Sequence, residues 1–176
     1  MSCGLTQGFN DRACNNSKGG LKSVIFYPLA NRTALTVTSN EVTTLTVTGE
    51  VYLYKLNRNL SSATYPSRGA ETGAVWTEQS LNVVLNQDTK ELRNEIHALT
   101  KNKEMGAIVE KADGTFIHLG LNEGLYVADG VEWGTGTARA DRNGGTIVLV
   151  GQENDAVPDV DPTVVSTLLA QQSPSV

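Results

Sequence analysis

The side chains best able to do chemistry in this sequence are two histidines and two cysteines, and their spacing suits neither a metal site nor nucleophilic catalysis. His97 and His118 are far apart, with no cysteine near either, which makes a poor metal-ligand set. Cys3 and Cys14 form no C-x-x-C motif, so a catalytic cysteine–histidine pair would depend on the N-terminal arm of the chain. We therefore expect structural histidines and reduced thiols.

Two further stretches match binding motifs only superficially. The run "GTGTARA", residues 134–140, lacks the third glycine of a dinucleotide-binding loop and does not open a helix. The acidic stretch 153–162 lacks the glycine and the final glutamate of an EF-hand, so we interpret it as a solvated acidic linker. The sequence thus predicts no cofactor, no metal and no catalytic residue, and we expect a protein that is not an enzyme.

Length and composition favour a single, mostly β domain. The 176 residues suffice to bury a sizeable core. With 17 glycines and 6% aromatic residues, many turns and a modest core are expected. The net charge of −5 argues against a general nucleic-acid binder. Because no apolar run approaches the ~20 residues that cross a bilayer and no signal-like segment precedes the cysteines, we expect a soluble protein made in the cytoplasm.

Charge is distributed unevenly along the chain. Residues 1–103 hold 11 Lys and Arg against 8 Asp and Glu, whereas residues 104–176 hold 3 against 11. One interpretation is chance variation of the surface. The other is one acidic and one mildly basic face, which suits assembly of like copies or a lumen that repels phosphate.

The elements that would carry a function begin with a threonine-rich ribbon, "TALTVTSNEVTTLTVTGEVYLYKL", at residues 33–56. It predicts a strand through Thr38, a turn at 39–41, a second strand through Thr48 and a bulge near Gly49. Its alternate face is polar but uncharged, and its single lysine, Lys55, lies at the far end, so its edges lack the usual protection. The simplest explanation is that another copy of the chain covers or continues these strand edges. The threonines of the ribbon are therefore candidate interface residues: Thr36, Thr38, Thr44, Thr46 and Thr48.

The remaining pattern predicts more strands and one helix. Strands are expected at 21–29 and 74–85, separated from the ribbon by a long loop at 57–73 without an apolar pattern. A helix is expected over about 88–102, with Asp88 as its cap, Glu91 completing a capping box, and an apolar stripe of Leu92, Ile96 and Leu99.

Three turn signals predict hairpins in the second half of the chain. They lie at Asp113-Gly114, at Asp129-Gly130 and at residues 143–145. The resulting expectation is a β-sandwich or barrel-like set of antiparallel sheets at 21–151, with one flanking helix, an N-terminal arm at 1–20 and an acidic C-terminal tail at 152–176. Within that tail, residues 163–170 suit a short helix or a docking segment.

The order of strands, long loop, "AVWTEQSLNVVLNQDTKELRNEIHALTKNKEMGAIVEKADGTFIHLGLNEGLYV" and "GTGTARADRNGGTIVLVGQE" resembles the tail tube proteins of tailed bacteriophages, over roughly residues 20–153. The resemblance implies hexameric rings whose inner sheets join into a continuous barrel, stacked into a tube. It also implies that the loop 57–73 reaches the adjacent ring, which makes Asn57, Arg58, Tyr65 and Arg68 further candidate interface residues.

The same resemblance implies a location and partners. The protein would be made in the host cytoplasm and reside in the virion tail, bound to copies of itself and to sheath, terminator or baseplate components. The lumen of such a tube is usually acidic, so DNA passes through without specific binding. Candidate lumen acids are Glu41, Glu110, Asp113 and Glu132.

Other function classes stay open at this point. A head decoration protein, a head–tail connector or a fibre-attachment module would share the β-rich pattern. A tube component forms hexameric rings that stack, whereas a decoration or fibre protein is expected to be trimeric or monomeric. A carbohydrate- or small-ligand-binding β-sandwich should expose aromatic residues, and only Trp76, Trp133 and five tyrosines are available. An enzyme is the weakest alternative, which a metal found by elemental analysis would revive.

Overall fold

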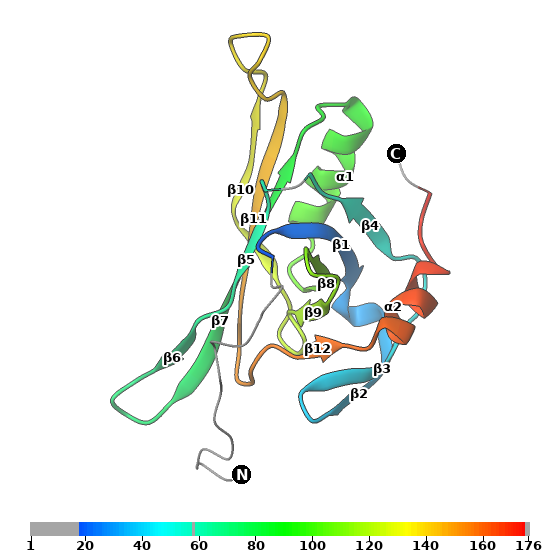
Figure 1. Ribbon diagram of the computed structural model, residues 1–176, viewed down its shortest axis with the longest axis vertical. Coiled ribbons are helices and arrows are strands. Elements are labelled where there is room, and N and C mark those ends of the chain that lie inside the picture. Colours follow the sequence, from blue (N-terminus) through cyan, green and yellow to red (C-terminus); the bar gives the residue numbers. More distant parts are fainter. Residues whose placement is uncertain (1–17, 58, 175–176) are drawn as a thin grey trace.

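The computed structural model describes residues 18–57 and 59–174, and these form two β-sheets flanked by two α-helices (Figure 1). The seven-stranded sheet has the order β2–β3–β12–β9–β8–β1–β4. Its strands are β1 (Leu21–Pro28), β2 (Arg32–Thr38), β3 (Glu41–Val47), β4 (Tyr52–Lys55), β8 (Met105–Lys111), β9 (Phe116–Leu119) and β12 (Asp159–Val160). A short 3-10 helix, Leu29–Asn31, joins β1 to β2.

The five-stranded sheet has the order β10–β11–β7–β5, and β6 also pairs with β7. Its strands are β5 (Ser62–Thr64), β6 (Ser67–Gly69), β7 (Val75–Leu85), β10 (Tyr126–Gly134) and β11 (Gly144–Glu153). The helices are α1 (Lys90–Lys101) and α2 (Pro162–Leu169). The predicted mostly β class with a flanking helix is therefore confirmed. None of the described helices is long and apolar enough to cross a membrane.

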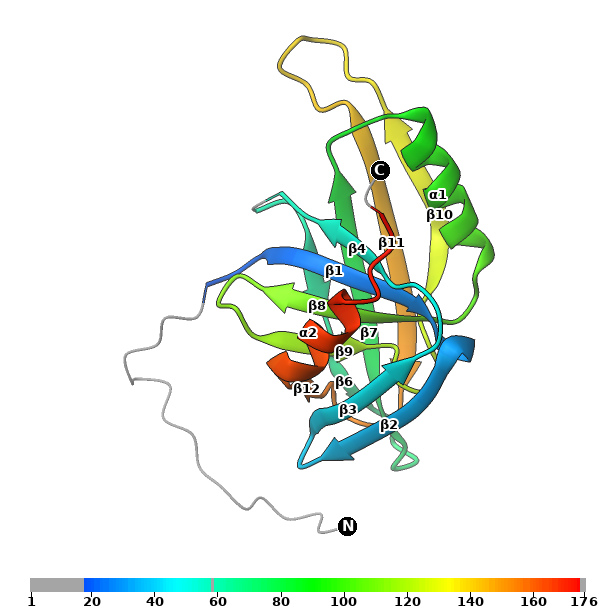
Figure 2. The ribbon, with the colours of Figure 1, turned by 90° about the vertical axis from the view of Figure 1, so that its right-hand side faces the viewer.

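The main core lies between the two sheets. Alternate residues of β7 and β11 point inward, and Leu81, Val83 and Leu149 meet Val24 and Ala107 of the other sheet. Helix α1 adds its stripe of apolar side chains to one end of this core. The long strands of the five-stranded sheet run steeply across β1 and β8 (Figure 2), so the sheets pack face to face at a large angle.

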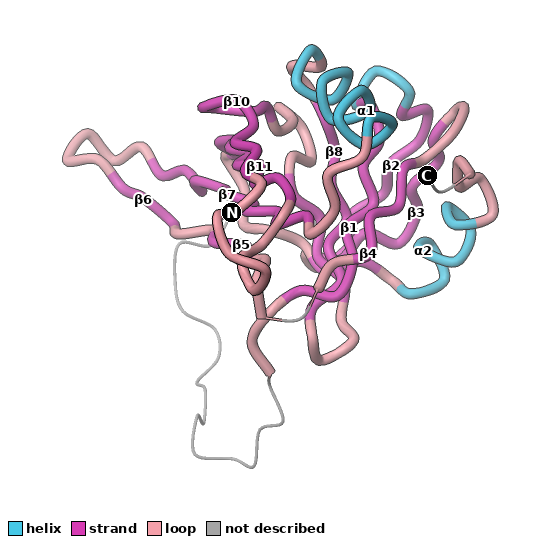
Figure 3. Tube along the Cα trace, turned by 90° about the horizontal axis from the view of Figure 1, so that it is seen from above, coloured by secondary structure: helices cyan, strands magenta, loops and turns pink. Residues whose placement is uncertain are grey.

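A second core lies on the opposite face of the seven-stranded sheet. There α2 and the β2–β3 hairpin cover a set of apolar side chains, and Val164, Val165 and Leu168 are the buried residues of α2. Seen from above, β6 and β7 lie on one side of the molecule and α2 on the other (Figure 3). The seven-stranded sheet is thus packed on both faces, whereas the five-stranded sheet is packed on one.

The C-terminal segment is built into the fold, which corrects the description of residues 152–176 as an acidic tail. Strand β12 pairs in parallel with β3 and antiparallel with β9. The Asp161 carboxylate then accepts the N–H of Thr163 and caps α2. The interpretation of residues 153–162 as a solvated acidic linker was wrong for Asp159 and Val160, because β12 needs only these two residues and both flanking strands are present to receive them.

Three local predictions also need correction. The cap of α1 is Thr89, whose hydroxyl accepts the N–H of Leu92, while Asp88 forms an ion pair with Arg93. Residues 57–73 are not a structureless loop, because β5 and β6 pair with β7. Asp129-Gly130 does not turn a hairpin, because β10 continues through it as an irregularity in its pairing with β11.

The turns at the other two predicted sites differ in kind. Asp113-Gly114 closes the β8–β9 hairpin as predicted, with Gly114 at φ 92°. The β10–β11 connection is a longer loop, residues 135–143, and Gly144 already belongs to β11. The β2–β3 hairpin turns at Ser39 and Asn40, both at positive φ, as a two-residue hairpin turn of type I′ requires.

Candidate assembly interface

One face of the five-stranded sheet is left uncovered by the other described elements. Its outward residues on β7 and β11 are half-buried by their neighbours alone, and they alternate with residues buried in the core. The face is formed by Trp76, Glu78, Ser80, Asn82, Val84, Thr146, Val148, Val150 and Gln152. Such an extended surface with few charges and several apolar side chains is typical of a contact with another protein.

The two edges of this sheet are also unpaired within the described chain. On one side β10 ends the sheet, and on the other β5 and β6 lie along β7 as short strands. Tyr126 on the β10 edge is 50% exposed and Tyr65 between β5 and β6 is 42% exposed. Unequal open edges on one sheet can pair head to tail with further copies.

The candidate threonines lie on the other sheet. Thr36 and Thr44 are cross-strand partners in the β2–β3 hairpin, and all five candidates are exposed to solvent. Strand β2 forms the outer edge of its sheet. Their backbone edge is therefore open among the described residues, but it belongs to a surface separate from the β10 and β5/β6 edges (Figure 1).

The candidates from residues 57–73 lie on different sheets, with Asn57 next to the seven-stranded sheet and Tyr65 and Arg68 on the five-stranded one. Asn57 is exposed at the end of β4, and Tyr65 is exposed between β5 and β6. The Arg68 guanidinium lies 2.9 Å from the Glu78 carboxylate and holds the pKa of Glu78 below its ordinary value. Arg68 is thus tied to the outer face of the sheet. Arg58, like Cys3 and Cys14, lies outside the described residues.

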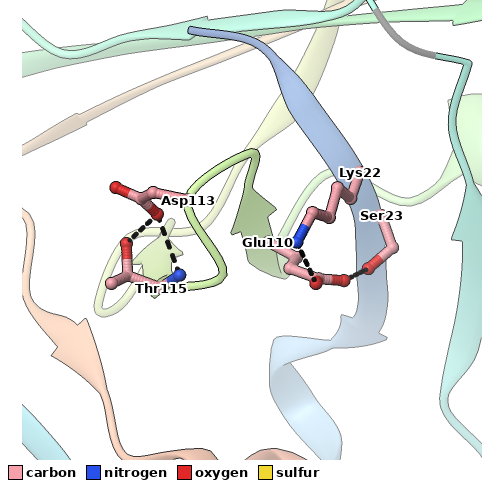
Figure 4. A network of polar contacts seen from close by, with 5 residues as sticks. All are labelled: Lys22, Ser23, Glu110, Asp113 and Thr115. Atoms are coloured by element: carbon pink, nitrogen blue, oxygen red, sulfur yellow. Dashed lines mark hydrogen bonds and ion pairs between the residues drawn. The ribbon is translucent and has the colours of Figure 1, made fainter. Parts of the chain in front are cut away.

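The four candidate lumen acids do not share one surface. Glu110 accepts a hydrogen bond from Ser23 at 2.8 Å and pairs with Lys22 at 3.4 Å, beside the hairpin turn that holds Asp113 (Figure 4). Glu41 starts β3 on the same, seven-stranded sheet. Only Glu132, opposite Thr146, lies on the five-stranded sheet.

Asp113 has a local structural role. Its carboxylate accepts the Thr115 hydroxyl at 2.6 Å and the Thr115 N–H at 2.9 Å, and these bonds hold its pKa below the ordinary range. The carboxylate is therefore ionised and directed at its own turn. This local role accounts for Asp113 without placing it in the wall of a channel.

A groove of about 700 Å³ opens beside the free edge of β4. Its walls are β4, the end of β7, α1 and the C-terminal residues 172–174. Burial, followed by the charge of Glu95 and the neighbouring Tyr52, raises the pKa of Tyr54 to about 12. Tyr54 is therefore neutral in the groove, and the lining residues include neither histidine nor cysteine.

A buried pair of side chains with acid–base character lies in the second core. The Tyr27 hydroxyl lies 2.7 Å from Nε2 of His118, and both side chains are fully buried. Burial raises the pKa of Tyr27 to about 12 and lowers that of His118 to about 3, so both are neutral at pH 7. The described residues hold no cluster of His, Cys, Asp and Glu that could bind a metal ion. The arrangement acts as a buried hydrogen bond within the core.

Acid is expected to destabilise the fold through His118. Burial, with the charge of Arg32, lowers its folded-state pKa to about 3, whereas the unfolded value is near 6.5. Between these values the unfolded chain binds a proton that the folded chain excludes. The free energy of unfolding therefore falls by up to about 1.4 kcal/mol per pH unit as the pH drops below the unfolded value, and the contribution is fully present above it.

Urea unfolding of the wild type and of His118→Gln at about pH 7 and about pH 5 measures this effect. The variant should lose less stability than the wild type over that interval, whatever its stability at neutral pH. Equal losses in the two proteins would contradict the assignment.

Sequence reasoning missed two buried polar residues that connect the five-stranded sheet to the loop between β9 and β10. Gln79 of β7 accepts the N–H of Gly120 at 2.7 Å, and Glu153 of β11 accepts the N–H groups of Asn122 and Glu123 at 2.7 and 2.9 Å. Both lie on the inward parity of their strands. That parity was the available signal, since a polar residue at a core position needs a partner.

No protein-family model, curated protein or solved structure matches this chain.

Proposed function

We propose that this chain is a structural virion protein that assembles into rings and stacks them into a phage tail tube. The observation that supports this most is the five-stranded sheet, which is packed on one face only and ends in the unlike edges β10 and β5/β6. Pairing of β10 in one copy with β5/β6 in the next continues the sheet, and a constant rotation per copy closes it into a ring.

In such a ring the uncovered face of the sheet becomes the inner wall. Its charged side chains would be Glu132, Arg142, which donates to Thr146, and the paired Glu78 and Arg68. The wall would then be nearly neutral, without the excess of basic groups that would bind phosphate. Of the four candidate lumen acids, the proposal therefore keeps Glu132 on the wall, where Arg142 offsets its charge.

The exposed threonines support a second contact. Strand β2 offers an open edge with polar, uncharged side chains, and its hairpin contains no lysine to block pairing. We assign this edge to contacts with copies or with other tail components such as sheath, terminator or baseplate proteins. In the tail tube the protein would have no cofactor and no catalytic residue.

Negative-stain electron microscopy of the purified protein, with light scattering at high concentration, tests the proposal. The wild type should form rings and stacked rings. Tyr126→Lys places a charge on the β10 edge and should shift the protein to monomers by at least tenfold in the concentration needed for rings. Leu169→Lys, a similar change on the exposed side of α2, serves as the control and should assemble normally. A wild-type protein that stays monomeric at every concentration would contradict the proposal.

A further inference from the structure

The five-stranded sheet ends in two hairpins that point in opposite directions. At one end the β10–β11 hairpin continues past the level of Leu85 into the tip 135–143. At the other end the β6–β7 hairpin turns at residues 70–74, where the Gly73 N–H donates to the Ala70 carbonyl. Figures 1 and 2 both place the tips at opposite ends of the long axis. The 11 residues of β7 alone hold them roughly 33 Å apart.

The β10–β11 tip presents a positive charge. The exposed Asp141 carboxylate accepts the N–H groups of Thr137 and Ala138 at 2.8 and 2.7 Å, and with Arg139 and Arg142 it leaves the tip one net positive charge. Arg142 is directed back along the strand and donates to the Thr146 hydroxyl. Arg139 is exposed and forms no ion pair with any described residue, so its guanidinium is the charge that the tip offers to solvent.

The opposite end of the sheet is acidic. Glu71 is the charged residue of the β6–β7 tip and is exposed. Glu153 pairs with Thr77 at the same level, and the adjoining loops carry the exposed Glu123 and Asp155. Asp159 and Glu41 are cross-strand partners in the seven-stranded sheet. The basic residues near this end are Arg68 of β6, which is paired with Glu78, and Arg32, which donates to the Leu121 carbonyl. Four of the 11 acids in residues 104–176 are among these residues: Glu123, Glu153, Asp155 and Asp159.

We infer that copies of this chain stack head to tail, with the Arg139 tip of one copy seated on the acidic end that holds Glu71 and Asp155 in the next. The inference rests on the proposed function, because it names the contact between stacked rings. Opposite charges favour this orientation, whereas two acidic ends brought together would repel. A contact that joins unlike ends by translation generates an open filament.

The strength of the contact follows from repetition. A single exposed ion pair contributes little in water. Copies fixed in a ring present the same pair many times at once, so the contacts act together as one multivalent interface. Stacking should therefore be steep in its dependence on salt, since each exposed pair is screened at distances near the Debye length of ~10 Å at 0.1 M.

Charge reversal of the tip tests the inference. Arg139→Glu should leave rings intact and shorten the tubes at least tenfold in electron micrographs at about 0.1 M salt. Arg139→Lys keeps the charge and should form tubes of wild-type length. Combining Arg139→Glu with Glu71→Arg and Asp155→Arg restores the opposite charges in the reverse direction and should restore long tubes.

The outcomes separate the two proposals. Absence of rings from the wild-type protein overturns the proposed function. Rings that stack equally well with Arg139→Glu overturn the stacking contact alone, as does a triple variant that fails to regain long tubes while still forming rings. Thermal unfolding of each variant checks that the fold is unchanged.

Discussion

Replacing Glu153 with alanine is expected to lower the free energy of unfolding by about 3 kcal/mol. The side chain is 4% exposed, and one of its oxygens accepts the N–H groups of Asn122 and Glu123. Removing the carboxylate leaves both donors in a partly buried loop without that partner, and each lost bond to a charged acceptor costs on the order of 1.5–3 kcal/mol before water compensates. Urea unfolding measures the loss.

Two further variants test whether the lost hydrogen bonds of Glu153 cause this destabilisation. Glu153→Gln keeps one acceptor oxygen in place and should lose about half as much stability, because the bonds become neutral ones. Gln152→Ala changes the exposed neighbour on the opposite face of β11 and should stay within about 0.5 kcal/mol of the wild type. If Glu153→Ala were as stable as Gln152→Ala, the carboxylate would not be what holds the β9–β10 loop.

Gly144→Ala should be about equally destabilising, at about 3 kcal/mol. A Cβ on Gly144 would overlap the carbonyl oxygen of Leu85 and lie 2.9 Å from its carbonyl carbon. Both atoms belong to the backbone of β7, which is held by nine paired positions along β11, so neither strand can shift alone. Overpacking of this kind costs 1–3 kcal/mol in ordinary cores, on the order of the upper value where backbone is displaced.

The chain supplies a matched control for this substitution. Gly134 is the cross-strand partner of Gly144 on β10, and a Cβ there would meet nothing within 4 Å. Gly134→Ala should therefore be neutral or slightly stabilising. Unfolding curves for the two variants, measured side by side, give the difference. Equal stabilities would show that the approach of β11 to β7 is looser than the structure has it.

Elements governed by local pattern were predictable from the sequence. The repeated threonine strands with a turn at Ser39–Asn40 became β2 and β3, and the stripe ending in Ile96 and Leu99 became the buried side of α1. In these segments the spacing of apolar residues and the turn chemistry agree, and no distant strand is needed to decide the conformation.

Elements governed by distant partners were not predictable. Asp129-Gly130 has the sequence of a tight hairpin, but pairing with β11 on both sides draws it into one long strand. The segment at 57–73 lacks an apolar pattern because β5 and β6 gain their hydrogen bonds from β7. The candidate lumen acids could not be grouped from the sequence for the same reason. Only the order of strands in the sheets shows that Glu132 and Glu110 belong to different sheets.

The position of β12 has a consequence for how the chain matures on the ribosome. Among the described residues, this two-residue strand is what joins the β2–β3 hairpin to β9 in the sheet. The hairpin therefore cannot join β9 until residue 160 has emerged, more than 110 residues after the end of β3, and closure over so many residues is slow. A product that stops before β12 would leave the β3 edge unpaired and prone to mispairing.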